Sequence, residues 1–254
     1  MIKIYKAFAL LSLTLTLTAC IEDTTTIKVH KDGKGQIEIS SHSRTNKMLK
    51  NDSGATFDKT LFEDIAQKMG TGVTLDSVEE NTNLQGFGYS ATFSFEDISQ
   101  VEIFNLQFAS STTSNDGETV TAVKISDSSQ SKLTFKLEGD VLNVMQHNIK
   151  DPNQGTKNPS ESDDAILAKL KSLKPTLDGS GEYLTIELLD PVKSTNAKHF
   201  DDNKVLLKSV DLKTIVEHVE KDIPKFRKAV DNKQVADWPG FKQDSQESVE
   251  IKFQ

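Results

Sequence analysis

The feature that most limits how this chain can fold is a series of short segments in which apolar and polar residues alternate, joined by short turns. The clearest pair is 24–30 and 36–42, separated by Lys31-Asp32-Gly33-Lys34-Gly35. Alternation with a period of two is typical of β-strands, and a glycine-rich turn between two such segments predicts a hairpin. Turns this short cannot join parallel neighbours, which need a crossover of about a dozen residues. We therefore expect antiparallel sheets.

Other alternating segments continue this pattern along the chain. A second hairpin is predicted from 73–80 and 87–95, and the Ser/Thr-rich stretch 110–118 is expected to be an exposed loop. The remaining predicted strands are 102–109, 120–126, 133–137, 141–146, 182–189, 192–195, 204–208 and 249–253.

Three segments repeat their apolar residues at helical spacing instead. The first, 57–69, is followed by Gly70 as a natural stop, and the second, 162–174, begins with Ser162 as a cap. The third begins at Asp211 and is expected to continue to 230. Together these patterns predict an α+β fold of antiparallel sheets built from hairpins and backed by about three amphipathic helices.

The beginning of the chain has the pattern of an export signal. Two early lysines precede an apolar run at 7–18, and Leu17-Thr18-Ala19-Cys20 places small residues directly before the only cysteine. The alternative is a transmembrane helix that stays in the protein. Because the run has about 12 residues and a bilayer core needs about 20, its length argues against a permanent span.

These residues resemble the lipobox of bacterial lipoproteins. The resemblance implies that a diacylglyceryl group, with fatty chains such as palmitate, is added to the Cys20 sulfur and that the chain is cut before Cys20. It also implies contact with the lipoprotein-processing and sorting machinery. Ile21 stands where an aspartate commonly retains Gram-negative lipoproteins at the inner membrane. The resemblance therefore implies an outer-membrane location in the cell envelope, on its periplasmic or surface side.

A polar stretch with two prolines at 148–161 divides the rest of the chain. The expected organisation is a signal peptide at 1–19, a lipidated tether at 20–26, a β-rich lobe with one helix at 27–147, a linker or mobile loop at 148–161, and an α+β lobe at 162–254. Segments 191–197 and 201–205, with the turn 32–35, resemble uncharacterised β-rich envelope lipoproteins. This second resemblance implies a domain of unassigned role and adds no catalytic residue.

Composition excludes one class of partner. The net charge is −8, and loss of Lys3 and Lys6 with the signal takes it to about −10. Nucleic-acid binding requires a clustered Lys/Arg surface that neutralises phosphates, so no nucleic-acid partner is expected. With its single cysteine acylated, the chain has no internal disulfide.

The search for chemical motifs yields no catalytic, cofactor-binding or metal-binding residues. The segment Asp32-Gly33-Lys34-Gly35 resembles part of a calcium loop, but it has His30 and Ser41 where an EF-hand needs acidic ligands. No hydrolase elbow, zinc motif or phosphate loop is present. His30 and His42 flank the first hairpin at offset positions, and we interpret this as coincidence.

One aromatic cluster is a candidate contact site. Trp238 and Phe241 lie in a Pro-Gly loop, where they could touch a partner or lipid headgroups; packing of Trp238 onto the body is the alternative. The expected function is a non-catalytic module that binds an envelope protein or small ligand, or assists assembly, at the membrane. An envelope hydrolase with an unrecognised site is the alternative. A deep pocket with converging carboxylates or a Ser/His pair would favour the hydrolase, and a shallow surface would favour binding.

Overall fold

The computed structural model describes residues 21–43, 59–80, 87–115, 118–147, 162–232, 234–235 and 238–254, and they form two β-sheets and two groups of helices. The larger sheet has the order β10-β11-β8-β1-β2-β4-β3, with β12 paired to β11. Its strands are β1 (Ile21–Val29), β2 (Gly35–Ser43), β3 (Thr74–Glu80), β4 (Phe87–Phe95), β8 (Gly181–Leu188), β10 (Phe200–Asp201), β11 (Lys204–Asp211) and β12 (Phe241–Gln243).

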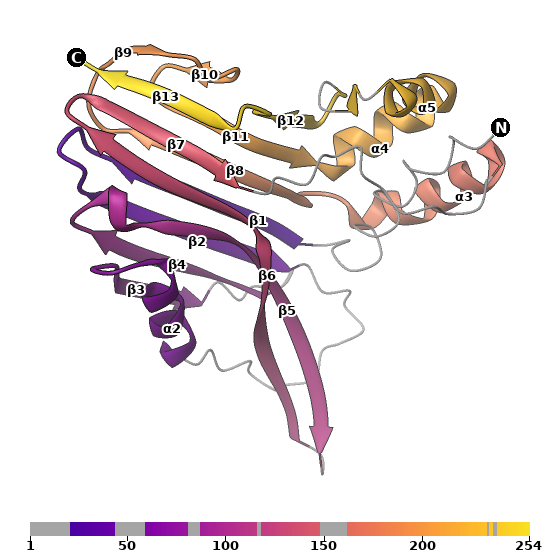
Figure 1. Cartoon of the computed structure of the whole chain (residues 1–254). Coiled ribbons are helices and arrows are strands. Elements are labelled where there is room, and N and C mark those ends of the chain that lie inside the picture. The colour runs from indigo at the N-terminus through magenta and orange to yellow at the C-terminus, as the bar shows by residue number, and fades with distance from the viewer. Residues whose placement is uncertain are drawn as a thin grey trace.

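The smaller sheet has the order β5-β6-β7-β13-β9 and packs against the larger one (Figure 1). Its strands are β5 (Glu102–Asn115), β6 (Glu118–Glu138), β7 (Val141–His147), β9 (Val192–Thr195) and β13 (Ser248–Phe253), and the short 3-10 helix η2 (Ile98–Gln100) precedes β5. The outer parts of β5 and β6 pair only with each other among the described residues and project away from the body as an arm.

The predicted α+β class and the two predicted hairpins are confirmed. β1 and β2 pair antiparallel from Ile21↔Ser43 to Val29↔Gly35, and β3 pairs antiparallel with β4. The turn between β1 and β2 needs both of its glycines, for different reasons. Gly33 has φ of +88°, and a Cβ on Gly35 would lie 1.9 Å from the Lys28 carbonyl oxygen.

One strand pair was not expected from the hairpin pattern. β1 pairs parallel with β8, from Glu22↔Gly181 to Val29↔Leu188. The short-turn rule does not apply to these strands because most of the chain lies between them. The predicted lobes 27–147 and 162–254 consequently share both sheets, since β8 pairs with β1 and β13 pairs with β7. The predicted linker 148–161 lies outside the described residues.

Three strands differ from the predicted ones in where they begin or end. β1 begins at Ile21, so residues 21–26, expected to be part of a tether, belong to the sheet, and 22–26 pair on both sides. The expected loop 110–118 is mostly strand, because its Ser/Thr residues pair across β5 and β6. β6 is one strand where two were predicted, with a register shift between its two parts.

The main core lies between the two sheets. Ile27, Ile37 and Phe93 from the larger sheet and Leu142 and Ile251 from the smaller one are fully buried in one cluster. Each such side chain contributes roughly 1.5–3 kcal/mol through removal of apolar surface from water. Helix α2 (Lys59–Met69) adds Phe62, Ile65 and Met69 to this cluster.

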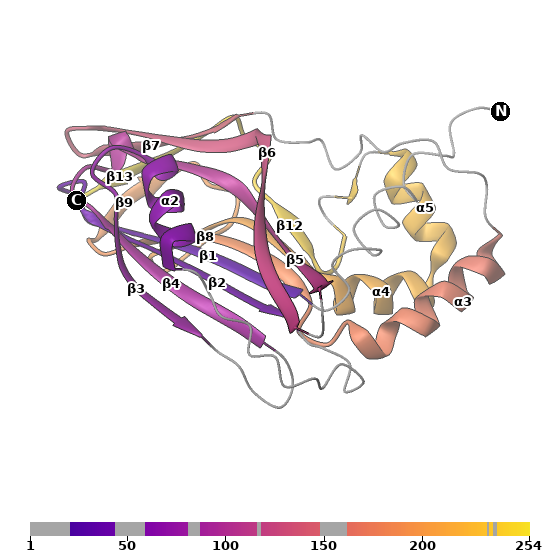
Figure 2. The ribbon, with the colours of Figure 1, turned by 90° about the horizontal axis from the view of Figure 1, so that it is seen from below.

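The other three helices form a separate unit, which we call the helical lobe. It consists of α3 (Asp163–Leu173), the 3-10 helix η3 (Lys174–Thr176), α4 (Leu212–Lys221) and α5 (Ile223–Asp231). Its own core contains Ile166, Leu170, Val216, Val219 and Phe226. These helices pack on one another instead of backing a sheet, and Figures 1 and 2 place them beyond the end of the sandwich where β1 begins.

The ends of the lobe helices follow from local sequence. The Ser162 hydroxyl accepts a hydrogen bond from the Ala165 amide, and the Asp211 carboxylate accepts one from the Thr214 amide. The single helix predicted from Asp211 onward is two helices that break at Asp222, because Pro224 suits the first turn of a new helix and not the middle of an old one. No helix in the described part of the chain is both long and apolar enough to cross a membrane.

Candidate functional site

A row of polar side chains crosses the inner face of the larger sheet near the end where β1 begins. Asp23 on β1 pairs with Ser41 on β2, and Ser41 pairs with Tyr89 on β4. Asp23 shares a face with Ile27 because side chains an even number of positions apart in a strand point the same way. Ser41 is 7% exposed and Tyr89 is 4% exposed. The row therefore brings hydrogen-bonding groups to the border of the apolar core.

Asp23 is the residue of this row whose pKa is shifted toward neutral pH. Burial raises the pKa of Asp23 to about 6; the Ser41 hydrogen bond and Lys208 lower it, and the neighbouring charge of Glu182 raises it further. Its Oδ1 atom is buried and has no hydrogen-bond partner among the described residues. Burial also raises the pKa of Tyr89, so its hydroxyl is neutral. Asp23 can therefore exchange a proton near neutral pH.

An ion pair continues the row on the other side of β1. Glu182 on β8 pairs in register with Asp23, and its carboxylate accepts a hydrogen bond from Lys208 Nζ at 2.5 Å. The positive charge of Lys208 therefore neutralises the charge of the Glu182 carboxylate, one of the two neighbouring carboxylates. The proton on Asp23 balances the other below about pH 6.

Asp244 provides a contrast within the same molecule. It is 0% exposed, and its carboxylate accepts hydrogen bonds from the backbone amides of Lys198 at 2.8 Å and Gln246 at 3.1 Å. Its burial is explained by these partners, which order the adjoining chain. Among the described residues, the Asp23 carboxylate has a hydrogen bond to the Ser41 side chain and none to a backbone amide, and for that reason it is the better candidate for a functional carboxylate.

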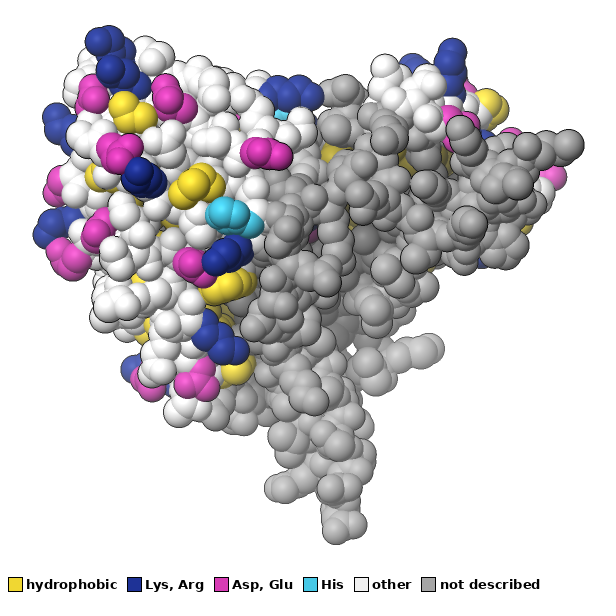
Figure 3. Space-filling view, in the orientation of Figure 1, with side chains coloured by type: hydrophobic (Ala, Val, Ile, Leu, Met, Phe, Trp, Pro, Cys, Tyr) yellow, Lys and Arg dark blue, Asp and Glu magenta, His cyan; other side chains and the backbone are white. Residues whose placement is uncertain are grey.

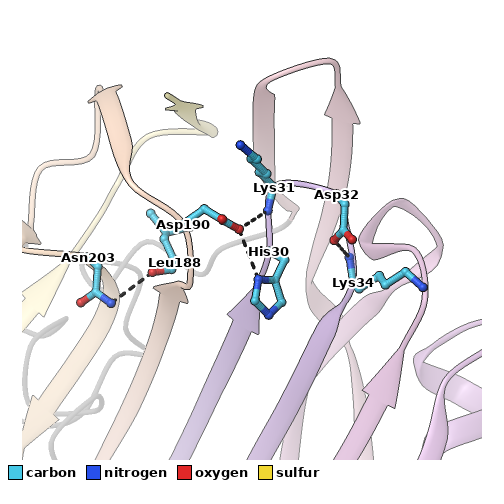
Figure 4. A network of polar contacts seen from close by, with 7 residues as sticks. All are labelled: His30, Lys31, Asp32, Lys34, Leu188, Asp190 and Asn203. Atoms are coloured by element: carbon cyan, nitrogen blue, oxygen red, sulfur yellow. Dashed lines mark hydrogen bonds and ion pairs between the residues drawn. The ribbon is translucent and has the colours of Figure 1, made fainter.

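A second polar group lies at the opposite end of β1 and is drawn in Figure 4. Asp190, between β8 and β9, accepts a hydrogen bond from the Lys31 backbone amide at 2.9 Å and contacts His30 Nδ1 at 3.2 Å. The Lys31 amide, and less strongly His30, lower the pKa of Asp190. Asn203 Nδ2 donates to the Leu188 carbonyl at 3.1 Å. These contacts join the β1–β2 turn to the ends of β8 and β11, and we call them the turn network.

The outer face of the larger sheet has a shallow hollow of about 240 Å³. Its lining is dominated by hydroxyl groups on three adjacent strands: Thr24, Thr26, Glu38, Ile39, Ser40, Ser90, Ala91 and Thr92. Such a surface can hydrogen-bond a polar ligand. It offers one carboxylate and no base or nucleophile pair for hydrolysis.

The surface over the smaller sheet shows no concentration of one charge. In Figure 3, basic and acidic side chains are interspersed over β7 and β13. The ion pair of Lys252 on β13 with Asp140 before β7, at 3.7 Å, accounts for part of this pattern. Lys132–Glu102 at 2.9 Å and Lys136–Glu138 at 2.7 Å show the same balance on β5 and β6. Among the described residues, no three His, Cys, Asp or Glu side chains are arranged to hold a metal ion.

The structure places the residues singled out from the sequence as follows. Trp238 is 6% exposed, and its ring meets Phe226 edge to face at 4.9 Å between centroids. Phe241 is partly exposed and packs against the same core of the helical lobe. Cys20 lies outside the described residues. The Trp238 side chain therefore packs onto the body, whereas Phe241 retains exposed surface for a contact.

The polar row was missed at the sequence level, although a signal for it exists. Asp23, Ile27 and Val29 have the same strand parity, so a strand extended to Ile21 would have placed a carboxylate on the buried face. Because residues 20–26 are predicted from the sequence to be a tether, Asp23 is not counted among the strand residues whose parity indicates the buried face. Ser41 and Tyr89 could be aligned with Asp23 only once the hairpin register was known.

Comparison with known proteins leaves the chain without an assigned family. Neither a protein-family model nor a curated protein sequence matches it. Among solved structures, the NMR structure of the folded domain of Mycobacterium tuberculosis LppM is similar, at 12% sequence identity and a TM-score of 0.37. The match covers 78% of this chain and 85% of that domain. At this TM-score the similarity does not establish a shared fold.

Proposed function

We propose that the protein is an envelope lipoprotein that is anchored through lipid on Cys20 and acts as a non-catalytic binding module. The lipobox Leu17-Thr18-Ala19-Cys20 supplies the anchor. Ile21 stands where an aspartate would retain a lipoprotein at the inner membrane, which supports an outer-membrane location.

The observation that carries this proposal is the position of β1. The strand begins at Ile21, next to the cysteine, and lies in the middle of the larger sheet. It has nine residues and spans about 30 Å at about 3.3 Å per residue. A lipid on Cys20 would hold one end of the sandwich at the leaflet, and the turn network at the other end of β1 would face the aqueous compartment.

The surfaces of the described residues support binding over hydrolysis. The hollow lined by hydroxyl groups is shallow, and the Ser41 hydroxyl is paired with a carboxylate instead of a histidine. The residues of the turn network lie mostly in loops, and the Leu189 side chain beside them is 41% exposed. In a contact made by these loops, Leu189 could add apolar area to the polar groups, since protein interfaces combine the two.

Intact-mass analysis of the native protein, combined with membrane fractionation, tests the anchor. We expect a chain that begins at Cys20 with a diacylglyceryl mass added and is found in the outer-membrane fraction. Cys20→Ala should abolish both the added mass and membrane recovery. A mature terminus elsewhere, or an unmodified thiol in a freely soluble protein, would refute the proposal.

Partner capture from native membranes tests the binding role, with two exposed lysines as a matched pair. Lys31 lies in the β1–β2 turn, and Lys68 lies on α2, away from the turn network. We expect Lys31→Glu to reduce capture and Lys68→Glu to leave it unchanged. Hydrolysis of envelope substrates by the purified protein, lost on Asp23→Asn, would favour the hydrolase alternative instead.

A further inference from the structure

The distance between the lipid and the folded body is fixed by the start of β1. An extended tether of six residues would reach about 20 Å. Residues 21–26 are instead held in the sheet, with Glu22 paired to His42 on β2 and to Gly181 on β8. No free residue remains between Cys20 and the sheet. Whatever lies at this end of the sandwich must therefore lie close to the leaflet.

The helical lobe is attached at this same end. Gly181, the partner of Glu22, follows Ser180, whose carbonyl accepts a hydrogen bond from the Leu212 amide at the start of α4. The Asp211 amide donates to the Gly240 carbonyl at 2.7 Å, which places the residue directly before β12 beside them. Both Figure 1 and Figure 2 show the lobe helices beyond the ends of the strands here.

The charge of the lobe differs from that of the whole chain. Residues 163–178 and 211–232 contain eight basic and eight acidic residues, whereas the chain has a net charge of −8. The net negative charge therefore lies outside the lobe. Anionic headgroups attract basic residues and repel acidic ones near the surface, so the lobe is repelled less than the rest of the protein.

We infer that the helical lobe, with residues 238–240 directly before β12, rests on the headgroup surface of the leaflet. This inference rests on the proposed anchor at Cys20. The occupant is a phospholipid surface because the acyl chains on Cys20 would bring that surface to the end of β1. Phe241, partly exposed at this end, and Lys242, exposed beside it, supply the kind of aromatic and basic groups that suit a headgroup layer.

Covalent labelling of native lysines measures this orientation without substitutions. The lipidated protein is labelled with an amine-reactive reagent in detergent and on phosphatidylethanolamine/phosphatidylglycerol vesicles, and modification is quantified by peptide mass spectrometry. Lys225 on α5 and Lys242 on β12 report on the lobe end, and Lys31 reports on the turn network; all three are exposed. On vesicles we expect labelling of Lys225 and Lys242 to fall several-fold and that of Lys31 to stay the same.

A linker variant separates tether length from intrinsic affinity. Inserting about 12 Gly/Ser residues between Cys20 and Ile21 lets the body move about 20 Å from the leaflet, so the protection of Lys225 and Lys242 should be lost. Equal labelling at both ends without the linker, stronger protection of Lys31, or protection that survives the linker would overturn the inference.

Failure of the anchor itself is recognised separately. If intact mass shows no lipid on Cys20, the proposed function fails. The orientation is then measured on the chain from Cys20 coupled through its single thiol to a maleimide phospholipid. The same lysine pattern decides that measurement.

Discussion

Replacing Asp23 by Asn should stabilise the protein at neutral and alkaline pH. An unfolded aspartate has a pKa near 3.8, and burial raises the folded pKa of Asp23 to about 6. The folded state therefore binds the proton more tightly than the unfolded state, and stability falls as pH rises from about 4 to about 6. At about 1.4 kcal/mol per pKa unit the full penalty above pH 6 is about 3 kcal/mol.

Asn is uncharged at every pH and still offers an acceptor to Ser41, so it should remove this penalty. We expect Asp23→Asn to be more stable than the wild type by about 1–3 kcal/mol at pH 8, and the difference to disappear below about pH 4. Urea unfolding of both proteins at a series of pH values measures this. Asp64→Asn, at an exposed position of α2, controls for the general effect of removing a negative charge.

Two results would refute the reasoning. A variant less stable than the wild type at pH 8 would mean that the Asp23 charge is stabilised by Lys208 more than it is penalised by burial. A stability difference that does not change with pH would mean that Asp23 has the same pKa in the folded and unfolded states.

Three further predictions concern the turn network and the helical lobe. Asp190→Asn should destabilise the protein by about 1 kcal/mol or less at pH 7, and the loss should shrink as pH falls below about 4, because the pKa of Asp190 is lowered on folding; urea unfolding tests this. Ser162→Ala should cost about 1 kcal/mol through loss of the cap, with Ser172→Ala near the end of the same helix as the control, measured by thermal unfolding. Trp238→Ala should cost about 3–5 kcal/mol, and the emission of this single tryptophan should be blue-shifted in the wild type; red-shifted emission would contradict its burial.

Local patterns in the sequence were sufficient to predict most elements of this fold. The alternation at 87–95 and 192–195 gave β4 and β9 with their observed bounds, and Ser162 marked the start of α3. Alternation and capping are local properties, and a single segment contains them in full. The antiparallel hairpins followed from turn length for the same reason.

Contacts between distant segments were not predictable in this way. The parallel pairing of β1 with β8 joins two segments that are far apart in the sequence, and neither segment alone indicates the other as its partner. The row of Asp23, Ser41 and Tyr89 depends on the register of three strands, and a shift of one residue would have moved Asp23 to the outer face. The anchor at Cys20 remains a prediction from its motif.

The pairing of β1 with β8 also determines when this protein can fold. Glu22 and Gly181 are partners although 159 positions separate them, and β13 enters the middle of the smaller sheet with its last residues near the end of the chain. Contacts this distant form slowly because a long loop must close before they gain any stability. While the chain is still emerging through a narrow pore, β1 would lack its neighbour β8 until about two-thirds of the chain had passed. If the chain is exported as we propose, such a delay would keep the polypeptide extended during export and postpone compaction until it reaches its destination.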